Sequence, residues 1–106
     1  MKRDKFASRH SVGRNQYAVI HKGYSKKIND IEFCFYKDGS KWKAIHGDSG
    51  TEICDNRTLM GVEENLEREI ENGGLMKFLN SPFMKNMIDE FQEMKTITEQ
   101  KFSMIA

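Results

Sequence analysis

The segment IEFCFYKDGSKWKAIH, residues 31–46, decides the fold expected for this chain. In its first half, Ile31, Phe33 and Phe35 occupy every second position, which is the alternation of a half-buried strand. Asp38-Gly39 then supplies the positive φ that a tight turn requires, and the remaining residues return as a second strand. The segment therefore predicts a β-hairpin.

Further β-forming stretches flank this hairpin. Residues 17–21, Tyr-Ala-Val-Ile-His, are rich in aromatic and β-branched side chains and end near Gly23. On the other side, residues 47–50 form a second turn and residues 51–54 a short strand. Because consecutive strands joined by short turns pair with one another, the sequence predicts an antiparallel β-meander of three to four strands.

After the strands, the apolar spacing changes from two residues to about 3.6, the period of a helix. Asn56 or Thr58 is expected to cap this helix, which ends at the Asn-Gly-Gly of residues 72–74. Glutamates occupy its other sides. The apolar stripe consists of Leu59, Val62, Leu66 and Ile70.

A turn over residues 75–80 leads to a second helix. It begins at Ser81-Pro82, because serine caps helices and proline is tolerated at the first helical position. Large apolar side chains recur along it at helical spacing, and residues 96–106 are taken as its continuation. The expected fold class is α+β, an antiparallel β-meander of three to four strands followed by two helices packing on one face.

A chain of 106 residues has the length of one domain, and its 31% charged residues leave no apolar run long enough to cross a membrane. Residues 1–15 show no sustained strand or helix period, so we expect a mobile or partner-ordered basic N-terminal arm. Residues 16–106 are expected to form a single α+β domain. No signal-peptide-like apolar stretch follows the first residues, which favours a cytoplasmic location.

The net charge of +1 conceals an asymmetry between the two halves of the chain. Residues 1–50 carry eleven Lys and Arg against five Asp and Glu, whereas residues 51–106 carry six against eleven. The basic excess lies mostly in the first 27 residues, where eight basic side chains face the single acidic Asp4. This pattern favours function through charged surfaces.

Catalytic and metal-binding patterns are weak. The sequence lacks the closely spaced Cys or His pairs of structural zinc sites, and His21 and His46 are expected at a strand edge or surface. The run His46-Gly47-Asp48-Ser49 holds the residue types of a triad, but neighbours around a turn point in different directions. We therefore expect a protein that is not an enzyme and takes no metal or cofactor, with Cys34 and Cys54 as free thiols.

Three groups of residues are candidates for binding a partner. The basic group would contact phosphates or a protein, with Tyr17, Tyr24 and Tyr36 available to stack on bases. The acidic group would occupy the basic groove of a nucleic-acid enzyme, and the apolar group would form a protein interface or a homodimer through the last helix. The basic group is Lys2, Arg3, Lys5, Arg9, Arg14, Lys22, Lys26 and Lys27; the acidic group is Glu63, Glu64, Glu67 and Glu71; the apolar group is Phe83, Met84, Met87, Phe91 and Met94.

The pattern from Lys41-Trp42-Lys43-Ala44 through Gly50-Thr51-Glu52-Ile53 to Thr58 resembles the hairpin-then-helix arrangement of small accessory proteins encoded by phages and mobile elements. The resemblance covers residues 31–72. It implies a short, non-enzymatic protein of the host cytoplasm that acts by binding. One such role is inhibition of a host defence enzyme, as by anti-CRISPR proteins, or of a nucleic-acid enzyme.

Three strands followed by a helix are also similar to the core of double-stranded-RNA-binding domains. This chain departs from that family because an amphipathic first helix is missing, and Glu63, Glu64 and Glu67 stand where the family has a lysine cluster. We therefore expect a protein that engages a protein partner as an accessory or inhibitory factor. The alternative is a nucleic-acid-binding module that uses the basic arm and the strand aromatics.

Overall fold

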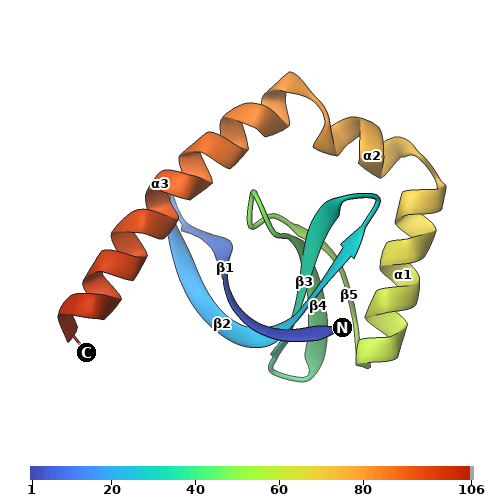
Figure 1. Cartoon of the computed structure of the whole chain (residues 1–106), viewed down its shortest axis with the longest axis horizontal. Coiled ribbons are helices and arrows are strands. Elements are labelled where there is room, and N and C mark those ends of the chain that lie inside the picture. Colours follow the sequence, from blue (N-terminus) through green and yellow to red (C-terminus); the bar gives the residue numbers. More distant parts are fainter. Residues whose placement is uncertain (106) are drawn as a thin grey trace.

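The computed structural model describes residues 1–105, and side chains up to residue 97. In this part of the chain, five strands form one antiparallel sheet in the order β1-β2-β3-β4-β5, and three helices follow (Figure 1). The α+β prediction is confirmed, with one strand more than expected. The elements are β1 (Lys2–Val12), β2 (Asn15–Ile28), β3 (Ile31–Asp38), β4 (Lys41–His46), β5 (Glu52–Asn56), α1 (Leu59–Glu71), α2 (Gly74–Leu79) and α3 (Pro82–Ile105).

Tight turns join the first four strands. Gly13 (φ 61°) begins the turn between β1 and β2, and Gly39 (φ 62°) begins the turn between β3 and β4. Between β2 and β3, Asn29 (φ 53°) and Asp30 (φ 65°) both adopt the left-handed conformation, which these two residue types tolerate well. Because each turn contains only two residues, consecutive strands are forced into an antiparallel meander.

Strand β1 corrects the expectation of an irregular N-terminal arm. Residues 2–12 pair with β2 along their whole length, from Lys2 opposite Ser25 to Val12 opposite Asn15. Both faces of this strand carry polar residues, so its sequence does not show the alternation of apolar and polar residues that predicts a strand. The strand forms because β2 and the two-residue turn at Gly13 hold it in register, which is a tertiary constraint.

The helices pack on one face of the sheet, here called the helix face, as predicted. At one end of this face, Val62 and Leu66 of α1 pack against buried Phe33 and Phe35 of β3. Farther along it, the ring of Phe91 in α3 packs on alanines of the first two strands. The remaining buried members of these two clusters are Ala44, Leu79 and Met84 in the first and Ala7 and Ala18 in the second.

The opposite face, here called the inner face, is buried without a helix. Cys34, Tyr36 and Ile45 lie on it, and Phe6 of β1 packs against them. The sheet curls so far that the backbone N–H of Arg9 in β1 donates to the carbonyl of Gly50, in the loop after β4 (3.0 Å). The curl therefore turns this face inward, while the helices form an arc outside it (Figure 1).

The helix ends follow the sequence signals. The backbone N–H of Gly61 donates to the hydroxyl of Thr58 (2.9 Å), so Thr58 caps α1, and Ser81 accepts from the N–H of Met84 (3.2 Å) at the start of α3. Where a turn was expected over residues 75–80, the chain forms the six-residue helix α2. No helix in the described residues is both long enough and apolar enough to span a bilayer.

Candidate binding groove

A groove of about 580 Å³ lies on the part of the helix face that the helices leave open. Every residue that lines it belongs to strands β1 to β4. The strand register places its cations and aromatic rings on the same face: Arg3 lies opposite Tyr24, and Lys37 opposite Trp42. We call this site the basic groove; it is lined by Arg3, Asp4, Lys5, Lys22, Gly23, Tyr24, Lys37 and Trp42.

The four cations of the basic groove are available to a ligand. Arg3, Lys5, Lys22 and Lys37 are all exposed, and within the described residues none of them forms an ion pair with a carboxylate. The one acid in the lining, Asp4, is occupied: it accepts from the backbone N–H of Lys5 (2.8 Å) and from the hydroxyl of Ser25 (3.3 Å). The lining of the groove therefore carries four cations against one carboxylate, an excess of positive charge.

Two aromatic side chains form the floor of the basic groove. The rings of Tyr24 in β2 and Trp42 in β4 lie 6.1 Å apart between centroids, on either side of β3. Both side chains are half-buried and pack with one side against the core below. The core thereby holds the rings in place at the surface of the groove.

Gly23 lets β2 pass close to β3 beside the groove. A Cβ atom at this position would lie 2.1 Å from the carbonyl oxygen of Phe35 and 3.0 Å from the ring of Phe6. A larger residue would push the strands apart and move Lys22 and Tyr24 with them. The sequence analysis placed Gly23 only as the end of a strand, whereas the structure makes it a close-approach point within β2.

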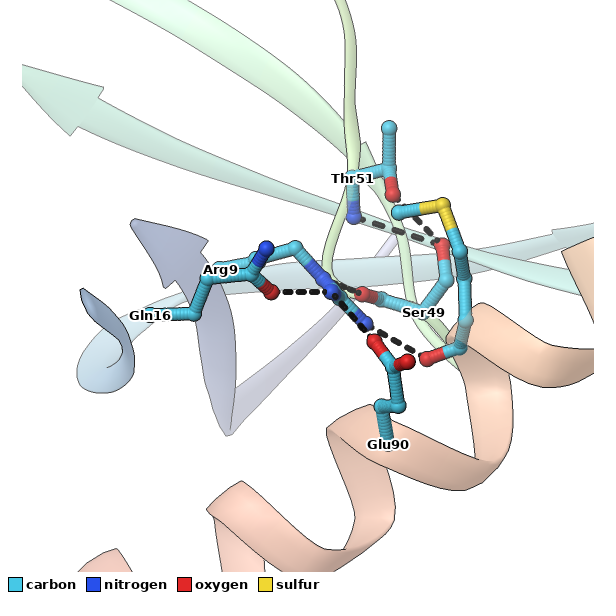
Figure 2. A network of polar contacts seen from close by, with 6 residues as sticks. Arg9, Gln16, Ser49, Thr51 and Glu90 are labelled. Atoms are coloured by element: carbon cyan, nitrogen blue, oxygen red, sulfur yellow. Dashed lines mark hydrogen bonds and ion pairs between the residues drawn. The ribbon is translucent and has the colours of Figure 1, made fainter. Parts of the chain in front are cut away.

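Arg9 lies on the same face as Arg3, but inside the protein (Figure 2). Its side chain is 9% exposed and donates to the carbonyls of Ser49 (3.1 Å) and Met87, and to the side chain of Gln16 (2.6 Å). Glu90 lies 3.6 Å from the guanidinium, and the ring of Phe91 lies 5.7 Å from its central carbon. Arg9 therefore joins β1 to the β4–β5 loop and α3, and its guanidinium is engaged with these partners inside the chain.

The other basic residues of the predicted group lie outside the groove. Lys26 binds Glu63 (2.7 Å) and Glu67 (3.6 Å) of α1, and the hydrogen bond that the lysine donates to Glu63 is the main cause that raises the lysine pKa. The basic and acidic groups are thus partly paired within the chain. Three exposed lysines and arginines lie elsewhere on the first two strands and their turn: Lys2, Arg14 and Lys27.

In both the acidic and the apolar group, some residues are exposed and others are paired or buried. On α1, Glu64 and Glu71 are exposed, whereas Glu63 and Glu67 are bound by Lys26. Of the apolar group, Met84 and Phe91 are core residues, and Met87 and Met94 are half-buried. Phe83 alone of that group is exposed, to 61%, and it lies beside the exposed ring of Phe78 (centroids 6.3 Å apart).

A second polar cluster, not foreseen from the sequence, lies on the inner face. The hydroxyl oxygen of Ser8 is 2.6 Å from Nε2 of His10 and 2.6 Å from Nε2 of His21. The His21 ring stacks on Tyr36, with centroids 3.8 Å apart. Burial, followed by the charge of His10, lowers the pKa of His21. Ser8 is only 1% exposed, so its hydroxyl is closed to a substrate and the cluster serves to hold the strands together.

His46 and Ser49, the first and last residues of the His46-Gly47-Asp48-Ser49 turn, are buried. Nδ1 of His46 lies 2.7 Å from the hydroxyl of Ser49, and the Ser49 hydroxyl donates to that of Thr51 (3.0 Å). His46 is 3% exposed, so the expectation of a surface position was wrong, and burial lowers its pKa. Asp48 is exposed, and its backbone carbonyl accepts from the side-chain amide of Gln92 (3.1 Å).

Metal-ligating groups are scattered over the described residues, where no three His, Cys, Asp or Glu side chains converge. Cys34 and Cys54 are free thiols on β3 and β5, with β4 between them. Burial raises the pKa of the Cys34 thiol to about 12 and that of Cys54 to about 11. No family model matches the chain, and no curated protein or solved structure is significantly similar to it.

Sequence reasoning found half of the basic groove. Arg3, Lys5 and Lys22 were in the predicted basic group, and Tyr24 was among the tyrosines expected to stack on bases. Lys37 and Trp42 were seen only as parts of a hairpin. The length of the turn gave the missing signal: residues 38 and 41 flank a two-residue turn, so residues 37 and 42 are the next cross-strand pair and must share a face, which the register confirms.

Proposed function

We propose that this protein is a nucleic-acid-binding module and that the basic groove is its binding site. One observation supports this most directly: four exposed cations without ion pairs and two aromatic rings share one open face of the sheet. Lysine and arginine neutralise phosphates and release their counterions, while aromatic rings supply surfaces on which bases stack. The serine hydroxyls of the two polar clusters, those of Ser8 and Ser49, are buried, which supports binding as the activity.

The salt dependence of binding tests this proposal. Four neutralised phosphates predict a slope of about −3 in the logarithm of the association constant against the logarithm of salt concentration. Affinity for a fluorescein-labelled oligonucleotide, measured by anisotropy, should therefore fall about 50-fold between about 50 and 200 mM salt. An affinity that is independent of salt would contradict a phosphate-binding groove.

A pair of charge reversals locates the site. Lys5→Glu combined with Lys22→Glu should abolish binding at low salt, because the two lysines lie opposite each other on the groove. The matched control is Lys77→Glu combined with Lys85→Glu, which changes the net charge equally at exposed helix positions outside the groove lining. If both double variants lost oligonucleotide affinity equally, binding would depend on net charge alone, and the basic groove would not be the binding site.

The second proposal is that the protein acts as an accessory or inhibitory factor on a protein partner. The exposed Phe78–Phe83 pair supports it, since adjacent exposed aromatic rings are typical of protein interfaces. Phe83→Ser should remove capture of the partner, or dimerisation measured by light scattering, and leave oligonucleotide affinity unchanged. A monomeric wild-type protein at micromolar concentration would exclude the homodimer.

A further inference from the structure

The ligand class can be narrowed from the arrangement of rings and charges within the basic groove. Arg3 and Lys5 are two residues apart on β1 and therefore lie about 7 Å apart along the strand. Lys22 faces Lys5 across the strand pair, and Lys37 lies beside the rings of the floor. The cations thus border a track whose floor is formed by Tyr24 and Trp42.

An unpaired base fits this floor better than a duplex does. In a duplex, the flat faces of the bases stack on one another, so aromatic rings of a protein cannot reach them without unstacking. In a single strand, those faces are free and stack on tyrosine or tryptophan whatever the base sequence. Half-buried rings at the bottom of a groove can therefore contribute to binding only if the bases of the ligand are exposed.

The surroundings of the groove also disfavour a duplex. Proteins that read a duplex insert a helix or a two-stranded ribbon into the major groove. Here every lining residue lies on the strands of the curled sheet, and the two aromatic side chains are half-buried against the core while the four cations are exposed. We propose that the basic groove binds single-stranded nucleic acid, with bases stacked on Tyr24 and Trp42 and phosphates held by Arg3, Lys5, Lys22 and Lys37.

This inference rests on the proposed nucleic-acid function, and the test separates the two. Trp42 is the only tryptophan of the chain, so its fluorescence reports directly on the floor of the groove. A thymidine oligonucleotide of about 12 nucleotides, within the site sizes of single-strand binders, should bind and quench this fluorescence. An abasic strand of the same length and inorganic polyphosphate carry the charge without the bases, and should bind more weakly with little quenching.

A duplex of the same length supplies the decisive comparison. We expect it to bind at least about tenfold more weakly than the single strand at equal salt, and to leave Trp42 fluorescence nearly unchanged. Equal affinities for duplex and single strand, or quenching by the abasic strand as strong as by thymidine, would overturn the inference and leave the wider function standing. Failure of every nucleic acid to bind would overturn both.

Two tyrosine variants test the stacking contact independently of Trp42. Tyr24→Leu should lower single-strand affinity about tenfold and leave polyphosphate affinity unchanged. Tyr17→Leu is the matched control, because Tyr17 is also on β2 and 43% exposed but lies outside the groove. Circular dichroism and thermal melting verify that both variants fold. Equal affinities of these two variants for the thymidine strand would contradict stacking on Tyr24.

Discussion

The two ends of strand β1 carry arginines on the same face of the sheet, but the surroundings of these arginines differ. Arg3 is exposed at the edge of the basic groove, whereas the Arg9 side chain is 9% exposed and is held by two carbonyls, an amide and a carboxylate. Both residues belong to the same basic stretch of sequence. The difference arises because α3 crosses the face at Arg9 and leaves it open at Arg3.

This comparison shows that the position of α3, and not the strand itself, determines whether an arginine of β1 is buried and hydrogen-bonded or exposed. At the covered end, which we call the closed end, the arginine donates hydrogen bonds to the backbone carbonyls of Ser49 and Met87. At the open end, the same residue type remains free to meet a phosphate. The described residues contain no buried side-chain nitrogen or oxygen without a hydrogen bond, so the closed end is fully satisfied without any ligand.

The largest predicted effect is at Gly50, which joins the closed end to the rest of the sheet. A Cβ at Gly50 (φ +68°) would lie 2.5 Å from the ring of Phe91 and 2.9 Å from the backbone nitrogen of Arg9. Gly50→Ala should therefore lower the free energy of unfolding by about 3 kcal/mol or more, through overpacking and backbone strain. Urea denaturation measures this loss.

Gly39→Ala is the control for that substitution. Gly39 has nearly the same φ, +62°, but a Cβ there would meet nothing within 4 Å. Its cost is therefore limited to the backbone strain, about 1 kcal/mol. If the two alanine variants proved equally stable, the contact among Gly50, Phe91 and Arg9 would not hold the closed end together.

The next prediction contrasts the two arginines directly. Arg9→Met should cost about 2–4 kcal/mol in the free energy of unfolding, because it leaves the carbonyls of Ser49 and Met87 without their donor. Arg3→Met should change stability by less than about 0.5 kcal/mol, as is usual for exposed positions, yet weaken oligonucleotide binding. A similar stability loss in both variants would erase the distinction between the closed and open ends.

Local sequence patterns predicted most of the fold but less of the site. The alternation at Ile31, Phe33 and Phe35, the Asp38-Gly39 turn and the Thr58 cap are short-range signals, and the structure confirms each. The curl of the sheet is not a short-range property. It depends on the contact between Arg9 and Gly50, which are far apart in sequence, and so the inner face could not be foreseen.

The same limit explains the two polar clusters. Ser8, His10 and His21 alternate with other residues along β1 and β2 as they would on an exposed face, whereas in the structure Ser8 is buried and the two histidines are half-buried. The groove was partly predictable because its cations lie near the N-terminus. The sequence could not show which of them α3 covers, since that depends on where a helix about 80 residues later packs.

The smallest predicted effect concerns His21 and His46, the two histidines whose pKa values burial lowers. Burial lowers the pKa values of His21 and His46 below the usual 6.5. Because these side chains take up protons more readily in the unfolded chain, stability should be greatest above pH 6.5 and decrease as the pH falls through that value.

Urea midpoints at about pH 7.5 and pH 5.5, on either side of the ordinary histidine pKa, measure this effect. The wild-type midpoint should be lower at the acidic value. The double variant His21→Gln and His46→Gln keeps side chains that can form hydrogen bonds but cannot titrate, so its midpoint should change less between the two conditions. Asp38 and Lys43 lie near His21 and remain in both proteins, and the comparison removes their contribution. If the urea midpoint fell equally in wild type and variant between the two pH values, protonation of His21 and His46 would not be the cause of the lower stability at acidic pH.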